Sequence, residues 1–246
     1  MTAKRAAILF CRCETGRHIP DERKRLILAS LEASGVYFSQ VPDLCAAAAE
    51  RDPLLRTLAA EPGGLVAVAC YPRAVRWLLS WAGADVPEDR LRVLNMREAD
   101  TGEICRALTI PEADAEAGQG KAPDAPAGGW TGWFPVVDGD RCRRCRQCLN
   151  FCPFGVYAAD EARGVAVCHP RRCKDQCPAC ARICPEAAIV FPKHAFAPIN
   201  GASVRPEDVD RHRQEAQARR VGSNAAFHAA LEARRPRVSP PCARGA

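Results

Sequence analysis

The sequence predicts two structural parts of different classes: an α/β domain with a parallel sheet over residues 1–110, and a small α+β domain over residues 135–195. Short apolar runs alternate with helical patterns in the first part, and cysteines gather in the second. Leu, Ile, Val and Phe number 28 in residues 1–110 but only 21 in the other 136. The first part can therefore bury a core, whereas the second needs another source of stability.

Four short runs rich in β-branched residues are the expected strands of the first part, at residues 6–11, 36–41, 64–70 and 91–95. Three helical patterns separate them, at residues 20–34, 46–60 and 72–82. Strands that alternate with helices in this way form a parallel sheet with right-handed crossovers. The expected strand order is 2-1-3-4, which is flavodoxin-like.

Cysteines stand at the ends of three of these expected strands. Cys11 and Cys13 close the first strand, Cys45 follows the second, and Cys70 ends the third. The carboxyl ends of neighbouring parallel strands meet at one edge of the sheet, where open α/β folds bind ligands. These four residues, the N-terminal set, are enough to hold a 4Fe-4S cluster. The alternative is a group of buried thiols that bind nothing.

Two cysteine runs repeat in the second part. Residues 142–153 read CRRCRQCLNFCP, or C-x2-C-x2-C-x3-C-P, and residues 173–185 read CKDQCPACARICP, with one more residue in the first gap. Cys145, Cys148 and Cys152 recur 32 positions later as Cys177, Cys180 and Cys184. Zinc bound by C-x2-C pairs is the alternative, but zinc sites do not need two runs of four that each end in Cys-Pro.

The C-x2-C-x2-C-x3-C-P run is a ligand pattern of bacterial 4Fe-4S proteins, in which the cysteine before proline ligates the other cluster. This rule predicts two crossed ligand sets. The first set is Cys142, Cys145, Cys148 and Cys184, and the second set is Cys173, Cys177, Cys180 and Cys152. Residues 136–192 resemble the two-cluster bacterial ferredoxins, which implies a fold of two short hairpins and two helices. Crossed ligands would hold the two halves together and supply the missing stability.

The first part carries a resemblance of its own. The stretches CRC at 11–13, LC at 44–45, VAVACYPR at 66–73 and NMRE at 95–98 resemble the N-terminal domain of the flavin-containing subunit of heterodisulfide reductase. The resemblance implies a third 4Fe-4S cluster held by the N-terminal set, with Arg73, Asn95 and Arg97 along the same edge. Glu14 stands where that family has Gly. The family's flavin domain is absent, and no GxGxxG follows a strand, so no flavin is expected.

Charge and hydropathy limit the partners. The net charge is +6, and residues 135–195 carry 10 basic against 6 acidic groups. Two cubanes of about −2 each when oxidised nearly cancel this excess, so nucleic acid is not the expected partner. No apolar run approaches the roughly 18 residues of a membrane span, and the run at 6–10 is too short for a secretory signal. We expect a cytoplasmic protein whose cysteines bind metal or do redox chemistry.

The remaining segments are polar. Residues 111–134 are expected to form a linker, because residues 113–129 consist largely of Ala, Gly and Pro. Residues 196–246 form a tail with two expected helices, at 206–220 and 224–235. The tail is either a solvated arm or a segment that orders on a partner.

The leading hypothesis is an iron-sulfur electron-transfer protein or subunit rather than an enzyme in its own right. It would pass single electrons through two 4Fe-4S clusters, with a candidate third, to a partner such as a larger oxidoreductase or flavoprotein. One alternative is a thiol or persulfide redox enzyme that uses Cys70 and takes electrons from the ferredoxin-like domain. Another is an iron-sulfur regulator that binds nucleic acid through its basic tail.

Overall fold

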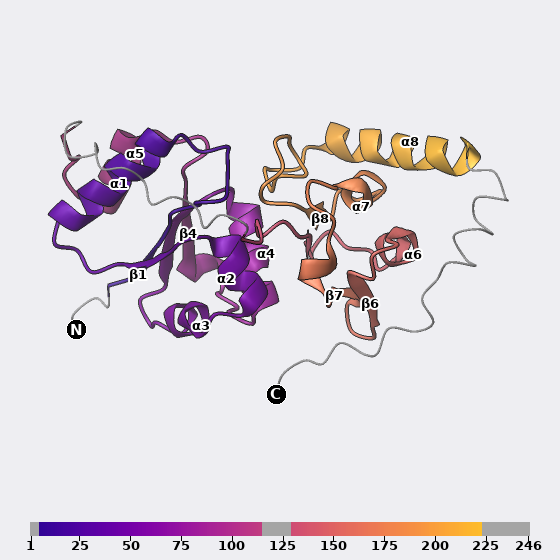
Figure 1. Ribbon diagram of the computed structural model, residues 1–246, viewed down its shortest axis with the longest axis horizontal. Coiled ribbons are helices and arrows are strands. Elements are labelled where there is room, and N and C mark those ends of the chain that lie inside the picture. Colours follow the sequence, from indigo (N-terminus) through magenta and orange to yellow (C-terminus); the bar gives the residue numbers. More distant parts are fainter. Residues whose placement is uncertain (1–4, 115–128, 223–246) are drawn as a thin grey trace. The chain divides into compact units, whose positions relative to one another are not determined.

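The structure is a computed structural model that describes residues 5–114 and 129–222 (Figure 1). The chain divides into two compact units, an N-terminal unit of residues 1–132 and a C-terminal unit of residues 133–246. No helix within the described residues is long and apolar enough to cross a membrane. Each unit is built around its own elements.

A four-stranded parallel sheet is the centre of the N-terminal unit. Its strands are β1 (Ala7–Cys11), β2 (Ser39–Val41), β3 (Leu65–Ala69) and β4 (Leu91–Asn95), in the order β2-β1-β3-β4. All three pairings are parallel. The parallel sheet expected from the sequence is thus confirmed, although β2 is only half as long as the apolar run at 36–41.

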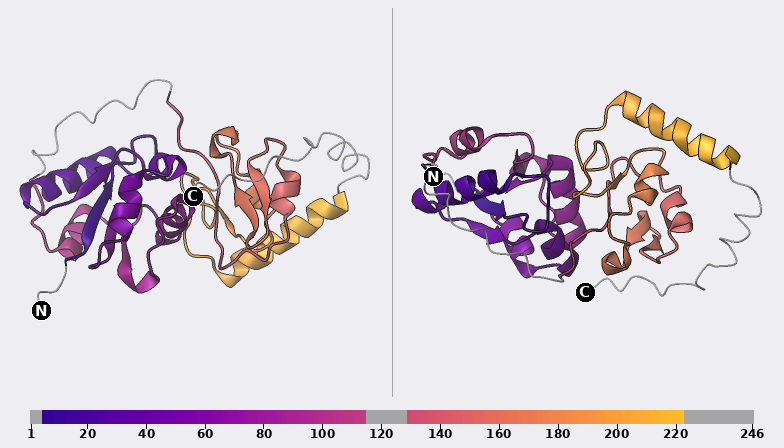
Figure 2. Two further views of the ribbon diagram at one scale, coloured as in Figure 1. Left: turned by 90° about the horizontal axis from the view of Figure 1, so that it is seen from below. Right: turned by 45° about the horizontal axis from the view of Figure 1, so that its top comes forward.

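Helices cover both faces of this sheet (Figures 1 and 2). α1 (Asp21–Ala33) and α5 (Thr101–Leu108) pack together on one face, and α2 (Leu44–Glu50), α3 (Pro53–Ala59) and α4 (Pro72–Ala82) lie on the other. A 3₁₀ turn, η1 (Glu88–Arg90), precedes β4. The core between the layers contains Phe10, Ile27, Leu31, Leu78 and Leu79, which are fully buried or nearly so.

The single helix expected at residues 46–60 is wrong, because the chain forms two helices there. Arg51 ends α2 in the left-handed conformation, with φ 53°, and its N–H donates to the carbonyls of Ala47 and Ala48. The Asp52 side chain then accepts from the N–H of Leu54, and Pro53 takes the first position of α3. Residues before proline avoid helical backbone angles, so the Asp-Pro pair breaks an Ala-rich run that would otherwise continue.

Two short antiparallel pairs and two short helices form the body of the C-terminal unit. β5 (Val136–Val137) pairs with β8 (Ile189–Val190), and β6 (Tyr157–Asp160) pairs with β7 (Gly164–Val167). The helices are α6 (Gln147–Phe151) and α7 (Ala179–Arg182), with a 3₁₀ turn, η3 (Pro170–Arg172), between them in sequence. β6 and β7 form a hairpin, whereas β5 and β8 come from the two ends of the segment.

The apolar core of the C-terminal unit is small. Trp133 stacks on Phe191, with ring centroids 5.0 Å apart, and Phe134 and Phe191 are completely buried. α8 (Pro206–Gly222) follows β8 and packs beside α7; it is the yellow helix of Figure 1. The second tail helix expected at 224–235, and most of the expected linker at 113–129, lie outside the described residues.

Candidate iron-sulfur site

The loop that carries the first cysteine run begins at a buried carboxylate. Asp138 is 3% exposed, and its side chain accepts from the N–H groups of Asp140 and Arg141. Its carbonyl accepts from the N–H of Cys142 at 3.0 Å. Arg144 and Arg146 then adopt left-handed angles, with φ 60° and 57°, so the chain winds tightly before α6 begins.

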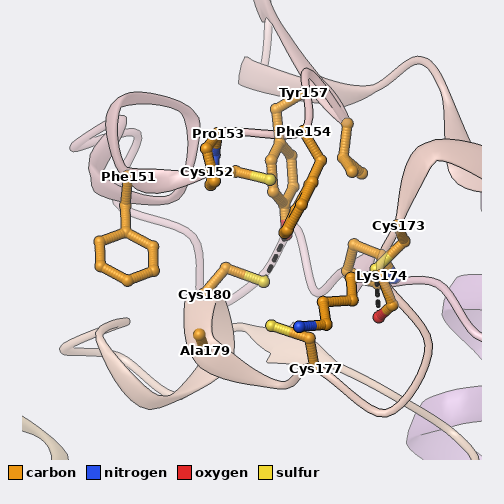
Figure 3. A pocket seen from close by; sticks show the side chains of 12 residues that line it. Phe151, Cys152, Pro153, Phe154, Tyr157, Cys173, Lys174, Cys177, Ala179 and Cys180 are labelled. Carbon is orange, nitrogen blue, oxygen red and sulfur yellow. Dashed lines mark hydrogen bonds between the residues drawn. The ribbon is translucent and has the colours of Figure 1, made fainter. Parts of the chain in front are cut away.

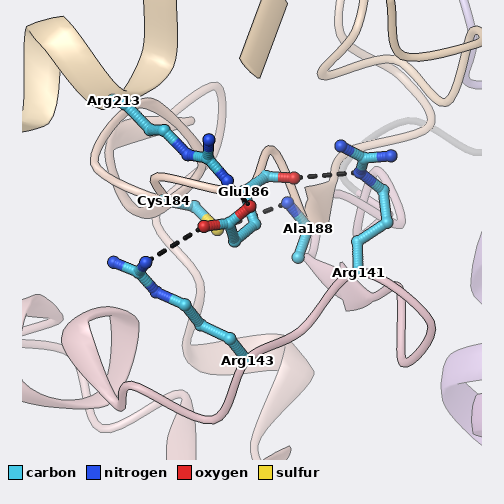
Figure 4. Close-up of polar contacts among 6 residues, drawn as sticks. All are labelled: Arg141, Arg143, Cys184, Glu186, Ala188 and Arg213. Carbon is cyan, nitrogen blue, oxygen red and sulfur yellow. Dashed lines mark hydrogen bonds and ion pairs between the residues drawn. The ribbon is translucent and has the colours of Figure 1, made fainter. Parts of the chain in front are cut away.

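The first set is brought together from both runs. Burial raises the pKa of Cys184, and the nearby thiols of Cys145 and Cys142 raise it further. Burial likewise raises the pKa of Cys148, with contributions from Cys180, Cys184 and Cys142. Each thiol affects another only at short range, so Cys184 of the later run lies among the first three cysteines of the earlier run. The Sγ of Cys184 also accepts from the N–H of Ala188 at 3.3 Å (Figure 4).

The second set is assembled in the same crossed manner. The pKa of Cys173 is raised to about 12, first by burial and then by Cys152 and Cys177. The pKa of Cys180 is also raised to about 12 by burial, although a hydrogen bond from Tyr157 lowers it, and Cys152, Cys173 and Cys177 raise it. Cys152 of the earlier run therefore lies beside three cysteines of the later run.

A hollow open to solvent is lined by these four cysteines. Figure 3 shows their sulfur atoms around it, with the rings of Phe154 and Tyr157 close by. The lining is otherwise mostly apolar, from Pro135, Phe151, Pro153, Phe154, Val156, Tyr157 and Ala179, with Lys174 as its one charged residue. Four thiols around an apolar hollow are the donor set that a 4Fe-4S cluster needs.

The chemistry of these cysteines also fits an iron-sulfur cluster. The raised pKa values of Cys173, Cys180 and Cys184 mean that, without metal, burial and the neighbouring cysteines keep these three as neutral thiols. Iron ions would stabilise the thiolates and release the protons. No three described Cys, His, Asp or Glu side chains converge closely enough to hold one metal ion. A 4Fe-4S cubane does not require its four cysteines to converge on one point, because each cysteine binds a different iron.

Glu186 joins three segments next to the first set (Figure 4). Its carboxylate pairs with Arg143 at 3.1 Å and with Arg213 of α8 at 2.9 Å. Its carbonyl accepts from the side chain of Arg141 at 2.9 Å. The first cysteine loop, the segment after Cys184 and α8 are thus linked through one residue.

Two polar residues of α8 are buried, which the sequence did not indicate. Asp208 is 2% exposed, and its carboxylate accepts from the backbone N–H of Arg205 and from the side chain of Arg211. His212 is 5% exposed, and its ring hydrogen-bonds the backbone of Cys184. Burial lowers the pKa of His212. The start of α8 therefore packs against the segment that contains Cys184 of the first set.

The N-terminal set lies at the carboxyl edge of the parallel sheet. Cys11 Sγ accepts from the N–H of Leu44 at 3.3 Å and shares a side-chain hydrogen bond with Cys13. That bond raises the pKa of Cys11, and burial adds to the effect. The pKa of Cys70 is raised to about 12 by burial and by Cys13, while Arg97 opposes the shift. Cys11, Cys13 and Cys70 are therefore neighbours.

Cys45 is the second residue of α2. It follows Leu44, whose N–H bonds Cys11, and it is 5% exposed. Gly16 gives Cys13 its room, because a Cβ at that position would lie 2.3 Å from Cys13 Sγ. Glu14, the departure from the resembled family, forms an ion pair with Arg12.

The other residues assigned to this edge have different surroundings. Arg97 lies close enough to Cys70 to lower its pKa and stacks over Tyr71, with 5.0 Å from its guanidinium carbon to the ring centroid. The Asn95 side chain is engaged in the following turn, where it donates to Glu98 and accepts from the N–H of Arg97. Arg73 is half-buried in the first turn of α4.

Cys105 belongs to a different place. It is buried on α5, and its pKa is raised by burial and lowered by a hydrogen bond with Ser30 of α1. These two helices pack on each other over one face of the sheet, away from its carboxyl edge. Cys105 is therefore a matched control for experiments on the N-terminal set.

Comparison with known proteins concerns the C-terminal unit most directly. Residues 134–219 match the family of 4Fe-4S dicluster domains. An uncharacterized ferredoxin of Methanocaldococcus jannaschii is 44% identical over 61 residues, which are 24% of this chain and 41% of that protein. A protein of Nitratidesulfovibrio vulgaris is 38% identical over 63 residues, 23% of this chain and 17% of its own length. The chain thus spans less than half the length of either relative.

No solved structure matches. Residues 134–219 are similar to a 4Fe-4S dicluster domain, and the thiols gathered there are of the type that such a domain uses.

Proposed function

We propose that this chain is an iron-sulfur electron-transfer protein or subunit that passes single electrons through two 4Fe-4S clusters to a partner redox enzyme. The first set would hold one cluster and the second set the other. The observation that carries the proposal is the crossed neighbourhood of the thiols: Cys184 lies among the cysteines of the earlier run, and Cys152 among those of the later run. A 4Fe-4S cluster supplies one-electron chemistry.

The chain's own residues would provide a path for the electron. Cys180 of the second set raises the pKa of Cys148 of the first set, so the two sets are adjacent. Cys145 is exposed, and Phe154, which lines the hollow of the second set, is 41% exposed. Both sets therefore reach the surface, where an oxidoreductase or a flavoprotein could give or accept electrons.

We further propose that the N-terminal set holds a third 4Fe-4S cluster, in keeping with the resemblance to heterodisulfide reductase. The approach of Cys11, Cys13 and Cys70 at the sheet edge supports it, and the buried Cys45 directly follows Leu44, whose N–H bonds Cys11. The thiol-enzyme alternative needs a reactive thiolate at Cys70. A pKa of about 12 leaves that thiol neutral at pH 7, which argues against Cys70 as a nucleophile.

Iron and sulfide analysis of the anaerobically reconstituted full chain, with electron paramagnetic resonance (EPR) of the reduced protein, tests both proposals. Three clusters require about twelve iron and twelve sulfide per chain, and two require about eight. Cys45→Ser should lose about four iron, whereas Cys105→Ser should lose none. Four iron or fewer in the wild type, or preferential binding of zinc, would reject the electron-transfer proposal. A content of eight iron, together with rapid alkylation of Cys70, would reject the third cluster and favour the thiol-enzyme alternative.

A further inference from the structure

A buried tyrosine hydroxyl bonds one cysteine of the second set. Tyr157 is the first residue of β6 and is 2% exposed. Its O–H donates to Cys180 Sγ at 3.1 Å, the dashed line in the centre of Figure 3. Cys180 is itself only 7% exposed. Because both residues are largely shielded from water, little solvent competes with this bond.

The internal repeat has no such hydroxyl in its other half. The 32-residue offset that relates Cys148 to Cys180 also relates Tyr157 to Ile189. The structure preserves this equivalence, because Tyr157 opens β6 and Ile189 opens β8. Ile189 is equally buried but has no side-chain hydrogen to donate. The two halves therefore differ in the hydrogen-bonding capacity of one side chain that occupies the same position in each.

A donor to a ligand sulfur affects the two oxidation states of a cluster unequally. The reduced cluster carries one more negative charge, part of which resides on the sulfur atoms, so it accepts the stronger hydrogen bond. The bond therefore stabilises the reduced state more. The low dielectric constant of a buried site increases the difference. A phenol has an ordinary pKa of about 10, so the hydroxyl donor keeps its proton at neutral pH.

We propose that Tyr157 raises the reduction potential of the cluster bound through Cys180, with no equivalent effect on the cluster bound through Cys148. Tyr157 acts here as a positioning residue that works through the ligand sulfur. The inference rests on the proposed function, since it requires both clusters. Each cluster takes up one electron from an external reductant, and no proton is transferred and no bond to Tyr157 is broken.

The test is an EPR-monitored redox titration of the full-length reconstituted chain, wild type against Tyr157→Phe, with dithionite as reductant. Two transitions belong to the C-terminal unit. We expect the equilibrium constant for reduction of one of them to fall about tenfold in the variant, or about 59 mV for one electron, and the other to stay in place. Tyr37→Phe is the matched control. It removes the same hydroxyl from a side chain that is 88% exposed, and it should shift neither reduction potential.

A second variant assigns the shifted transition. Cys184→Ser perturbs the first set, so the transition that it alters must differ from the one that Tyr157→Phe shifts. If Tyr157→Phe keeps its full iron content and shifts neither transition, or shifts both equally, the inference is wrong while the proposed function stands. If the wild type itself lacks the eight iron of the two sets, the proposed function fails first.

Fluorotyrosine gives a test in the opposite direction that leaves the fold intact. Its hydroxyl is the stronger donor because the ring fluorine lowers its pKa. Incorporated at all three tyrosines of the chain, it should raise the reduction equilibrium constant of the same cluster severalfold. The effect should vanish in the Tyr157→Phe background and persist in Tyr37→Phe. An effect that survives in Tyr157→Phe would overturn the proposal even if that variant bound less iron.

Discussion

The two units gather their cysteines by opposite means. In the N-terminal unit, strands with a core of their own end at one edge of a sheet and bring Cys11, Cys13 and Cys70 together. In the C-terminal unit, eight cysteines come from tight loops around two small strand pairs and a core of few large side chains. A sheet would position its thiols with or without metal. Loops with so small a core depend for their folded conformation on the metal that their thiols bind.

The largest expected effect is the response to removing iron. Chelation of the reduced protein should unfold much of the C-terminal unit, because metal binding would supply much of its free energy of folding. The parallel sheet of the N-terminal unit should remain folded. Hydrogen exchange followed by mass spectrometry measures this unit by unit. Amides of β6 and β7 should lose protection, and those of β1 and β3 should keep it. Equal loss of protection in both units would show that the sheet also depends on bound iron.

The next largest effect concerns crossed ligation. Cys184→Ala should cost about four iron and leave Cys142, Cys145 and Cys148 open to alkylation, because their cluster lacks its fourth ligand. Cys152→Ala should expose Cys173, Cys177 and Cys180 instead. Alkylation followed by peptide mass mapping distinguishes the two patterns. Exposure of the cysteines in the mutated run itself would contradict the crossed sets.

A smaller effect is expected at the sheet edge. Gly16→Ala places a methyl group where Cys13 Sγ now lies, since the new Cβ would be 2.3 Å from that atom. Cys13 must move, and the N-terminal unit should bind less iron while the C-terminal unit keeps its content. Gly102→Ala is the control, because the nearest atoms there belong to the flexible ends of Glu112 and Arg106. Equal iron content in the two variants would argue against Cys13 as a ligand.

The smallest effect is expected for the link between α8 and Glu186. Arg213→Ala removes an ion pair in which Arg213 is about half exposed, so the loss of unfolding free energy should be about 0.5 kcal/mol and smaller in high salt. Denaturant unfolding of the iron-loaded protein measures it. Arg182→Ala, on an exposed residue of α7, should cost less. A loss of several kcal/mol at Arg213 would mean that α8 is essential to the unit.

The parallel sheet and the cysteine runs could be predicted because their signals are local. Apolar β-branched runs between helical patterns mark β1, β3 and β4, and the repeat of C-x2-C spacing marks the loops. The break between α2 and α3 was missed, although the Asp52-Pro53 pair is a local signal too. The many Ala and Leu residues of that stretch favour a helix and led to the prediction of a single one. The structure instead breaks the helix before Pro53.

Other features could not be predicted, because they depend on contacts between distant segments. Nothing in a polar helix indicates that Asp208 and His212 would be buried, because their burial depends on how α8 packs against α7. The spacing of Tyr157 from either run does not indicate that its hydroxyl meets Cys180. Periodicity locates elements, but the direction of a polar side chain across a site is a tertiary property.

The crossing of ligands between the two cysteine runs also determines whether each run could bind a cluster on a separate chain. A single run on a separate chain would have three cysteines for one cluster and a fourth that cannot reach it. It could complete its ligation only by exchanging that fourth cysteine with a second copy. With the proposed crossed ligand sets, the C-terminal unit would have the connectivity of such a swapped dimer, joined into one polypeptide by the segment from Pro153 to Arg172. A covalent link of this kind removes the dependence on concentration, and it allows the two halves to carry different residues, Tyr157 and Ile189, at equivalent positions.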